Sequence, residues 1–141
     1  MPVQKLAVTP VTASRETTVE ELVRTMADED LGDLVITDDG KPVGIVTDRD
    51  VVLALARHGE VGSLTAADVM TADPVTIRGD AEDFDLAETF AEAKVRRLPV
   101  VDENGDLTGV VTLDDLVATV GEEMKDVATV IEAQSPGYSP E

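Results

Sequence analysis

The hydrophobic positions of this chain follow two patterns, one typical of helices and one of buried strands. Residues 19–27 place apolar side chains at helical spacing, and the pair Thr17 and Glu20 favours a capping box at the start of that helix. Two apolar runs, DLVIT and PVGIVT, then flank Asp39-Gly40, a dipeptide typical of a hairpin turn. A second helical pattern follows. Because the runs are continuously apolar, we expect strands buried on both faces.

The same order of elements occurs twice, so the chain contains an internal duplication. LGDLVITD at residues 31–38 corresponds to VRRLPVVD at 95–102, and GIVTDRD at 44–50 corresponds to GVVTLDD at 109–115. The second copy has one extra residue in its turn, DENG in place of DDG, and Asp80 is the expected cap of its first helix. The sequence therefore predicts an α/β fold of two pseudo-symmetric β-α-β-β-α repeats.

The pattern also predicts where the repeats begin and end. We expect a first repeat over residues 1–60, a second over 61–125, and a helix end with a flexible tail over 126–141. A Gly-rich linker joins the repeats, and a short helix is expected to start near Thr65. Gly121 is expected to separate the last helix of the second repeat from a terminal helix.

Charge excludes one class of function. The chain has 30 acidic and 11 basic residues, for a net charge of −19. Such a chain repels phosphate backbones, so nucleic-acid binding is not expected. The acidic residues are spread among periodic apolar positions, which argues against a disordered acidic tail. We interpret the charge as an adaptation to a salt-rich cytoplasm, where salt screens the self-repulsion.

Composition also narrows the chemistry. The chain has no Cys and a single His, His58, which lies near the linker, so a Cys nucleophile and a Ser-His-Asp arrangement have little support. Neither a P-loop nor a dinucleotide-binding glycine pattern occurs. The start of the chain has no apolar signal core and no apolar run is long enough to span a membrane, so a cytoplasmic, non-catalytic protein is expected.

A Thr and an Asp three residues apart follow the last strand of each repeat. These pairs are Thr47 with Asp50 and Thr112 with Asp115, and a glycine stands three residues before each Thr. One interpretation is a helix N-cap with an acidic residue in the first turn. The other is a pair of acceptors for the two hydroxyls of a ribose, as in dinucleotide-binding folds. The repetition, and the glycine inside each strand, favour the second interpretation.

These motifs, together with VRRLPVVDENG and ADVMTADPVTI, resemble the cystathionine-β-synthase (CBS) domain family as a tandem pair, over about residues 5–125. The resemblance implies a regulatory module that binds an adenosine-containing ligand, such as AMP, ADP or ATP, in clefts between the repeats, and that forms a homodimer. S-adenosylmethionine or NAD is an alternative ligand. A protein-interaction module with empty clefts is the alternative function. No cofactor is expected, and the regulated partner would be another protein of unknown identity.

The resemblance implies a first cleft that suits a phosphorylated ligand. Asp115 and Thr112 would hold the ribose, with Arg96 and Arg97 near the phosphate. The base would be framed by four residues of the other repeat: Thr9, Ser14, Leu31 and Gly32.

The second cleft departs from this pattern. Asp50 and Thr47 would hold the ribose there, with Arg49 nearby. The residues opposite would be Asp73, Arg78, Val95 and Arg96. In the first repeat Asp33 stands where the second repeat has Arg97, and its charge would repel a phosphate, an effect that Arg49 would offset only partly. We therefore expect this cleft to be empty or to hold a less charged ligand.

Overall fold

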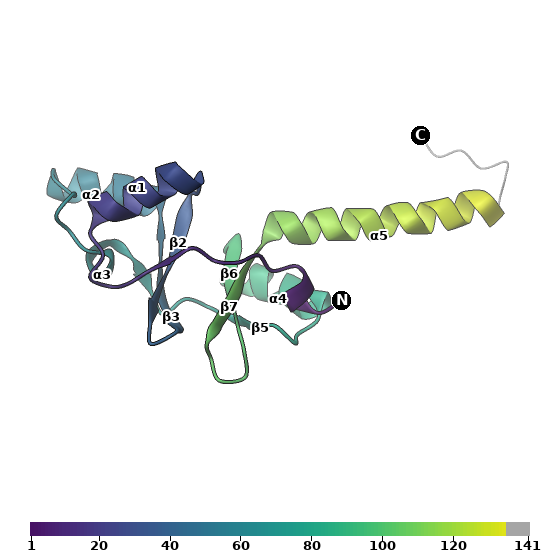
Figure 1. Cartoon of the computed structure of the whole chain (residues 1–141). Coiled ribbons are helices and arrows are strands. Elements are labelled where there is room, and N and C mark those ends of the chain that lie inside the picture. The colour runs from purple at the N-terminus through teal and green to yellow at the C-terminus, as the bar shows by residue number, and fades with distance from the viewer. Residues whose placement is uncertain (135–141) are drawn as a thin grey trace.

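Two small mixed sheets lie side by side, each covered by helices (Figure 1). The computed structural model describes residues 1–134, so the predicted tail beyond them lies outside the described residues. The first repeat contains β1 (Thr12–Ala13), α1 (Val19–Glu29), β2 (Asp33–Asp38), β3 (Lys41–Thr47) and α2 (Asp48–His58). The second contains β5 (Ile77–Arg78), α4 (Asp83–Ala93), β6 (Arg97–Val101), β7 (Leu107–Thr112) and α5 (Leu113–Gln134). The predicted β-α-β-β-α order is confirmed in both repeats.

The first three strands of the first sheet have the same order as the three strands of the second. In the first sheet β1 is parallel to β2, and β2 is antiparallel to β3. In the second sheet β5, β6 and β7 pair in the same way. Asp39 and Gly40 both have positive φ, as the predicted tight hairpin requires. The longer second turn is closed by Asp102, whose carboxylate accepts the backbone N–H groups of Asn104 and Asp106.

Each repeat is completed by the segment that precedes the first strand of the other repeat. The 3₁₀ turn η1 (Val3–Lys5) packs into the core of the second repeat, where Val3 is fully buried. The short helix α3 (Ala66–Val69), predicted near Thr65, packs into the core of the first repeat. Both segments continue along a sheet edge. β4 (Thr71–Ala72) pairs with β3, and Val8 exchanges two backbone hydrogen bonds with Val110 on β7. The predicted boundary between the repeats at residue 60 stays a prediction. In space, each repeat includes a segment that precedes the first strand of the other repeat.

A core of apolar side chains lies under the helices of each repeat. The buried residues of the first are Val19, Leu22, Met26, Leu34, Ile36, Val46 and Ala66. Those of the second are Val3, Ile77, Leu86, Phe90, Leu98, Val100, Val111 and Leu116. Both sets follow the helical and strand spacing read from the sequence.

The opposite face of each sheet is also buried. Val35, Pro99 and Val101 alternate with the core residues of β2 and β6, so they point away from the cores, yet all three are inaccessible or nearly so. Contacts between the repeats occur at both ends of these strands. At the turns, Leu107 donates its N–H to Gly40 O (2.9 Å), and at the strand starts Arg97 pairs with Asp33. The second faces therefore meet, as the continuous apolar runs predicted.

Two predicted helix caps are wrong by one or two residues. Thr18, not Thr17, caps α1, because the Thr17 hydroxyl accepts the N–H of Ser14 in the preceding turn. Glu82, not Asp80, caps α4, because Asp80 forms an ion pair with Arg78. In each case a polar residue one or two positions later in the chain is also able to cap the helix, so the sequence did not separate the two candidates.

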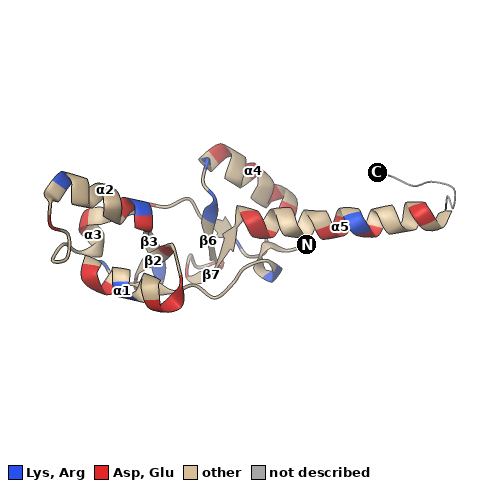
Figure 2. Ribbon diagram, turned by 90° about the horizontal axis from the view of Figure 1, so that it is seen from above, with Lys and Arg blue, Asp and Glu red and all other residues tan. Residues whose placement is uncertain are grey.

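The predicted break at Gly121 is also wrong. α5 continues through this glycine to Gln134 as one helix of 22 residues, and its distal half projects away from the repeats (Figure 1). A single helical Gly costs about 1 kcal/mol relative to Ala, which good helix formers on both sides can offset. Acidic residues lie along α1, α4 and α5 rather than in one patch (Figure 2). No helix among the described residues has the length and apolar character needed to cross a membrane.

The two strand glycines allow the edge segments to approach closely, and they should differ in tolerance. A Cβ on Gly109 would lie 2.8 Å from Ala7 Cβ and 3.2 Å from the Val8 carbonyl oxygen, neither of which can move freely. A Cβ on Gly44 would meet the Sδ, Cγ and Cβ atoms of Met70, a flexible side chain that can rearrange more easily than backbone. We expect Gly109→Ala to lower the unfolding free energy by about 1–3 kcal/mol, and Gly44→Ala by less. Chemical denaturation measures both, and equal losses would contradict this explanation.

Candidate functional site

The two Thr-x-x-Asp motifs occupy equivalent corners where a strand turns into a helix. Thr47 ends β3 before α2, and Thr112 ends β7 before α5. At each corner the first helical N–H donates to the carbonyl of the residue just before the neighbouring strand. Asp48 N–H donates to Gly32 O (2.9 Å), and Leu113 N–H donates to Arg96 O (2.8 Å). The duplication therefore builds the same corner twice.

The corner of the first repeat is a closed capping box. The Thr47 hydroxyl accepts the Asp50 N–H (3.1 Å), and the Asp50 carboxylate accepts the Thr47 N–H (2.9 Å). Both side chains thus satisfy backbone groups that the helix start would leave unpaired. The N-cap interpretation accounts for this copy of the motif.

The corner of the second repeat is only half closed. The Thr112 hydroxyl accepts the Asp115 N–H (3.1 Å), as in the first repeat. No donor within residues 1–134 reaches the half-buried Asp115 carboxylate, in contrast to Asp50. Asp115 therefore keeps its acceptor oxygens available for a ligand hydroxyl.

An ion pair joins the two corners. Asp33 lies opposite Thr47 in the first hairpin, and Arg97 lies opposite Thr112 in the second. The Arg97 Nε lies 2.9 Å from the Asp33 carboxylate. The Asp33 side chain is 12% exposed and that of Arg97 is 45% exposed. The two repeats thus bring both threonines to one end of the shared interface.

Burial dominates the electrostatics of Asp33. Desolvation raises the pKa of its carboxyl group, while the guanidinium of Arg97 lowers that pKa and the carboxylate of Asp48 raises it again. The net direction is upward, so the charged carboxylate is less stable here than in water. Arg97 offsets this cost only in part.

Arg96 is held much more loosely than Arg97. Its guanidinium pairs with Asp114 at 2.8 Å, and the two side chains are 72% and 77% exposed. Exposed pairs of this kind contribute little stability and exchange readily. Arg96 can therefore turn toward a ligand at small cost.

Asp33 and Arg97, expected from the sequence in separate clefts, are in contact. Each residue begins a buried strand, but only the packing of β2 against β6 brings them together. No local spacing encodes that contact. The opposite charges at the same position of the two repeats were the one available signal.

The remaining predicted residues are distributed around the molecule. Leu31 and Gly32 precede Asp33 and lie at the shared end of the sheets. Ser14 follows β1 and its hydroxyl lies 3.1 Å from that of Thr17. Thr9 follows Val8, the residue bonded to β7. Val95 and Arg49 are exposed near the starts of β6 and α2.

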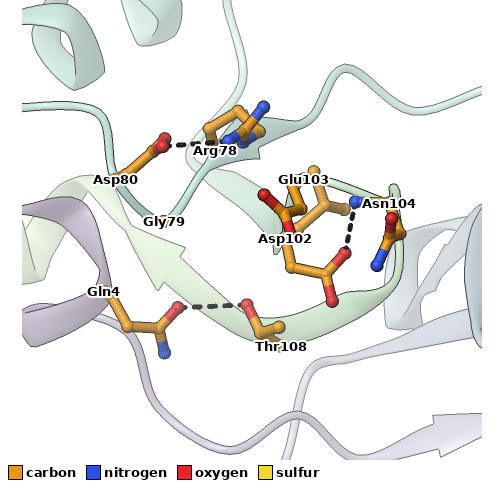
Figure 3. Close-up of a pocket in the computed structure, with 9 residues that line it drawn as sticks. Gln4, Arg78, Gly79, Asp80, Asp102, Glu103, Asn104 and Thr108 are labelled. Carbon is orange, nitrogen blue, oxygen red and sulfur yellow. Dashed lines mark hydrogen bonds and ion pairs between the residues drawn. The ribbon is translucent and has the colours of Figure 1, made fainter.

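Arg78 and Asp73 lie at the other end of the strands, where two cavities open. The larger, about 410 Å³, is lined by Arg78 together with Gln4, Asp80, Asp102, Glu103, Asn104 and Thr108, among others (Figure 3). Arg78 points toward Asp80, with which it pairs at 2.9 Å. The second cavity, about 330 Å³, is lined by Asp73, Pro74, Thr76 and the hairpin residues Lys41, Pro42 and Gly105, with Val101. The structure therefore does not bring Arg78 and Asp73 close to Thr47 and Asp50.

Three carboxylates in the larger cavity make it unsuitable for a phosphate. Asp80, Asp102 and Glu103 outnumber Arg78, whose charge is already offset. Among residues 1–134, no cluster of His, Cys, Asp and Glu has the arrangement of a metal site. Thr112 and Asp115 remain the better placed candidates for binding a nucleoside.

Two repeats that share an interface, each ending in a Thr-x-x-Asp corner, define a tandem α/β module. The chain belongs to the CBS domain family, whose sequence model matches residues 3–57 and again residues 66–122. An uncharacterised protein of Methanopyrus kandleri is 35% identical over 124 residues, which cover 82% of this chain and 63% of that relative. The chain thus spans less than two thirds of that protein.

Solved structures of the family superpose on the whole pair. The CBS domain pair of protein MJ0100, in complex with 5′-methylthioadenosine and S-adenosylmethionine, has a TM-score of 0.77 and 26% identity, and the match covers 87% of this chain and 98% of that one. A CBS domain protein from Pyrobaculum aerophilum, complexed with AMP, has a TM-score of 0.73 and 25% identity, with coverage of 82% and 89%. The predicted tandem pair is confirmed.

Replacing Asp33 by Asn tests the balance of burial and pairing. The pKa of Asp33 is raised in the folded state. Its carboxyl group therefore adds its full stabilisation to the free energy of unfolding below its unfolded pKa, near 3.9, and this stabilisation is lost as the pH rises through the folded-state pKa. We expect Asp33→Asn to melt higher than the wild type at pH 7, with the difference shrinking toward pH 4. Asp38→Asn, which removes an exposed paired carboxylate, is the control and should change little. A lower melting temperature for Asp33→Asn at pH 7 would mean that the Arg97 pair outweighs burial.

Proposed function

We propose that this chain is a non-catalytic regulatory module that binds an adenosine-containing ligand between its two repeats, in the cytoplasm. The observation that carries the proposal is the available Asp115 carboxylate beside Thr112, at the end where the repeats meet. A carboxylate can accept both vicinal hydroxyls of a ribose in charge-assisted hydrogen bonds. Family members bind AMP, 5′-methylthioadenosine and S-adenosylmethionine, which share that ribose.

The Asp115 corner is the primary site in this proposal. Asp50 already bonds to the Thr47 backbone, so ribose binding there would compete with the capping box. Gly32 and Leu31 of the other repeat lie at the same end of the interface as Thr112 and would approach the base. Bound ligand would therefore contact both repeats and stabilise their arrangement, which a separate partner protein could sense.

The residues of the site within 1–134 support a role without catalysis. His58 ends α2 next to the cap residue Gly59, and it is exposed. The carboxylates at the shared end are held in caps or ion pairs or stand alone, and none forms a nucleophile with an adjacent base. A sensing role uses these residues without a chemical step.

A protein-interaction module is the second candidate function. Two arginines at the shared end are already paired with carboxylates, Arg97 with Asp33 and Arg96 with Asp114. If no ligand displaces these partners, the repeats serve only as a scaffold. Calorimetry that detects no heat with AMP, ATP, NAD, adenosine or S-adenosylmethionine would favour this candidate.

We also propose that the chain forms a homodimer through its long C-terminal helix. Val117, Val120, Met124, Val127 and Ile131 recur at alternating spacings of three and four along α5, and each is 44–63% exposed. Val52 and Leu55 on α2 are exposed as well, at 64% and 50%. A second copy of α5 would cover an apolar stripe of this kind.

Substitution of Asp115 tests the binding proposal directly. Losing a charge-assisted contact to two ribose hydroxyls should cost about 2–3 kcal/mol, or roughly a 30- to 150-fold loss of affinity for an adenosine ligand. We expect Asp115→Ala to show this loss in titration calorimetry, with a small change in melting temperature. Asp50→Ala should instead lower the stability by about 0.5–2 kcal/mol and leave affinity nearly unchanged, because it opens a capping box. If Asp115→Ala binds the adenosine ligand as tightly as the wild type, both motifs serve only as helix caps.

Light scattering tests the dimer at tens of micromolar protein in molar KCl. The wild type should have the mass of a dimer, and Val127→Glu should have that of a monomer, because a charge in the stripe opposes helix packing. Thr129→Glu adds the same charge on another face of α5 and serves as the control. A monomeric wild type would overturn the proposal.

A further inference from the structure

The end of the interface that carries Asp115 is rich in carboxylates. Asp33 and Asp48 belong to the first repeat, and Asp114 and Asp115 to the second. Of the arginines there, Arg97 is paired with Asp33 and Arg96 with Asp114. Two of the positive charges that a phosphate group would seek are therefore paired within the protein, Arg97 with a largely buried carboxylate and Arg96 with an exposed one.

We propose that Asp33 is a specificity-determining residue that makes the cleft prefer adenosine ligands without a phosphate, such as neutral or cationic 5′-substituted nucleosides. This inference rests on the proposed function and names the ligand class of the same site. It reverses the expectation, drawn from the Arg96-Arg97 sequence, that the Asp115 cleft suits a phosphorylated ligand.

The contact between Asp33 and Arg97 is the first support. The Nε of Arg97 lies 2.9 Å from the Asp33 carboxylate as an ion pair, so a phosphate that binds this guanidinium must share it with, or displace, an existing anion. A displaced Asp33 would then stand unpaired at 12% exposure, close to the incoming negative charge. A nucleoside without a phosphate leaves the ion pair intact.

The poor solvation of Asp33 is the second support. Burial raises the pKa of this carboxyl more than the Arg97 guanidinium lowers it, so the charge of Asp33 carries an energetic cost at this place. Charged groups held at an energetic cost beside a binding surface are a common mark of a functional role.

The burial of Asp33 distinguishes this pair from its neighbour. Arg96 and Asp114 are both more than 70% exposed and can separate into water, whereas Asp33 is confined between the two repeats. Asp33 therefore acts as a fixed negative charge next to Arg97, and Asp114 does not. This difference supplies a matched control.

The experiment compares AMP with 5′-methylthioadenosine, which keeps the adenosine and lacks the phosphate. Calorimetry in 0.15 M KCl would use the full chain as wild type, Asp33→Asn and Asp114→Asn. We expect the wild type to bind 5′-methylthioadenosine at least tenfold more tightly than AMP. Asp33→Asn should bind AMP about 10- to 30-fold more tightly than the wild type, because Arg97 is released, and its affinity for 5′-methylthioadenosine should change less than about threefold.

Further variants separate the possible failures. Asp114→Asn should change AMP affinity less than about threefold, and Asp33→Asn combined with Arg97→Ala should lose the gain. If AMP binds the wild type and Asp33→Asn equally, or if Asp114→Asn gives the same gain, the role of Asp33 is overturned while the proposed function stands. If neither ligand binds any folded variant, the proposed function fails and this inference fails with it.

Discussion

Burial of the second face of each sheet is the constraint on which the structure depends. Leu34 and Ile36 fill one core, and Val35 between them points to the other face of the sheet, where other residues must bury it. Pro99 and Val101 of the second repeat also point away from their own core, and they are buried where the two repeats face each other. Neither sheet could remain in water alone without exposing a continuous apolar face.

The candidate site follows from this contact. Packing β2 against β6 places the starts of both strands together, and each start lies opposite the threonine that ends the next strand. The surroundings of a cleft residue such as Asp115 thus depend on residues more than 80 positions away in the chain, Asp33 among them. Binding and the arrangement of the repeats are coupled because they use the same surface.

The exchanged edge segments strengthen the coupling. Val3 fills the second core although it precedes the first repeat in the chain, and Ala66 fills the first core although it precedes the second. The repeats cannot separate without uncovering both cores. The two glycines inside β3 and β7 are needed for this exchange, since the edge segments approach the strands there. The two glycines, whose place inside a strand favoured a close ligand, instead have the protein's own Met70 and Ala7 as close neighbours.

The sequence contained enough to predict the repeats, the hairpins and the elements, because apolar spacing and turn residues are local properties. It was also sufficient to identify Thr112 and Asp115 as a corner. It could not distinguish the closed box of Asp50 from the open carboxylate of Asp115, because both motifs have the same spacing. Nor could it find the contact of Asp33 with Arg97, which exists only when two strands from different repeats pack together. The interpretation of the acidic surface as an adaptation to salt stays a prediction.

A crystal structure of the chain grown with 5′-methylthioadenosine tests the central claim most directly. The account predicts that the ribose hydroxyls lie within hydrogen-bond distance of the Asp115 carboxylate, between the two repeats, with the ion pair of Asp33 and Arg97 intact. A ligand bound instead in the cavity beside Arg78 and Asp102, or on one repeat alone, would contradict it.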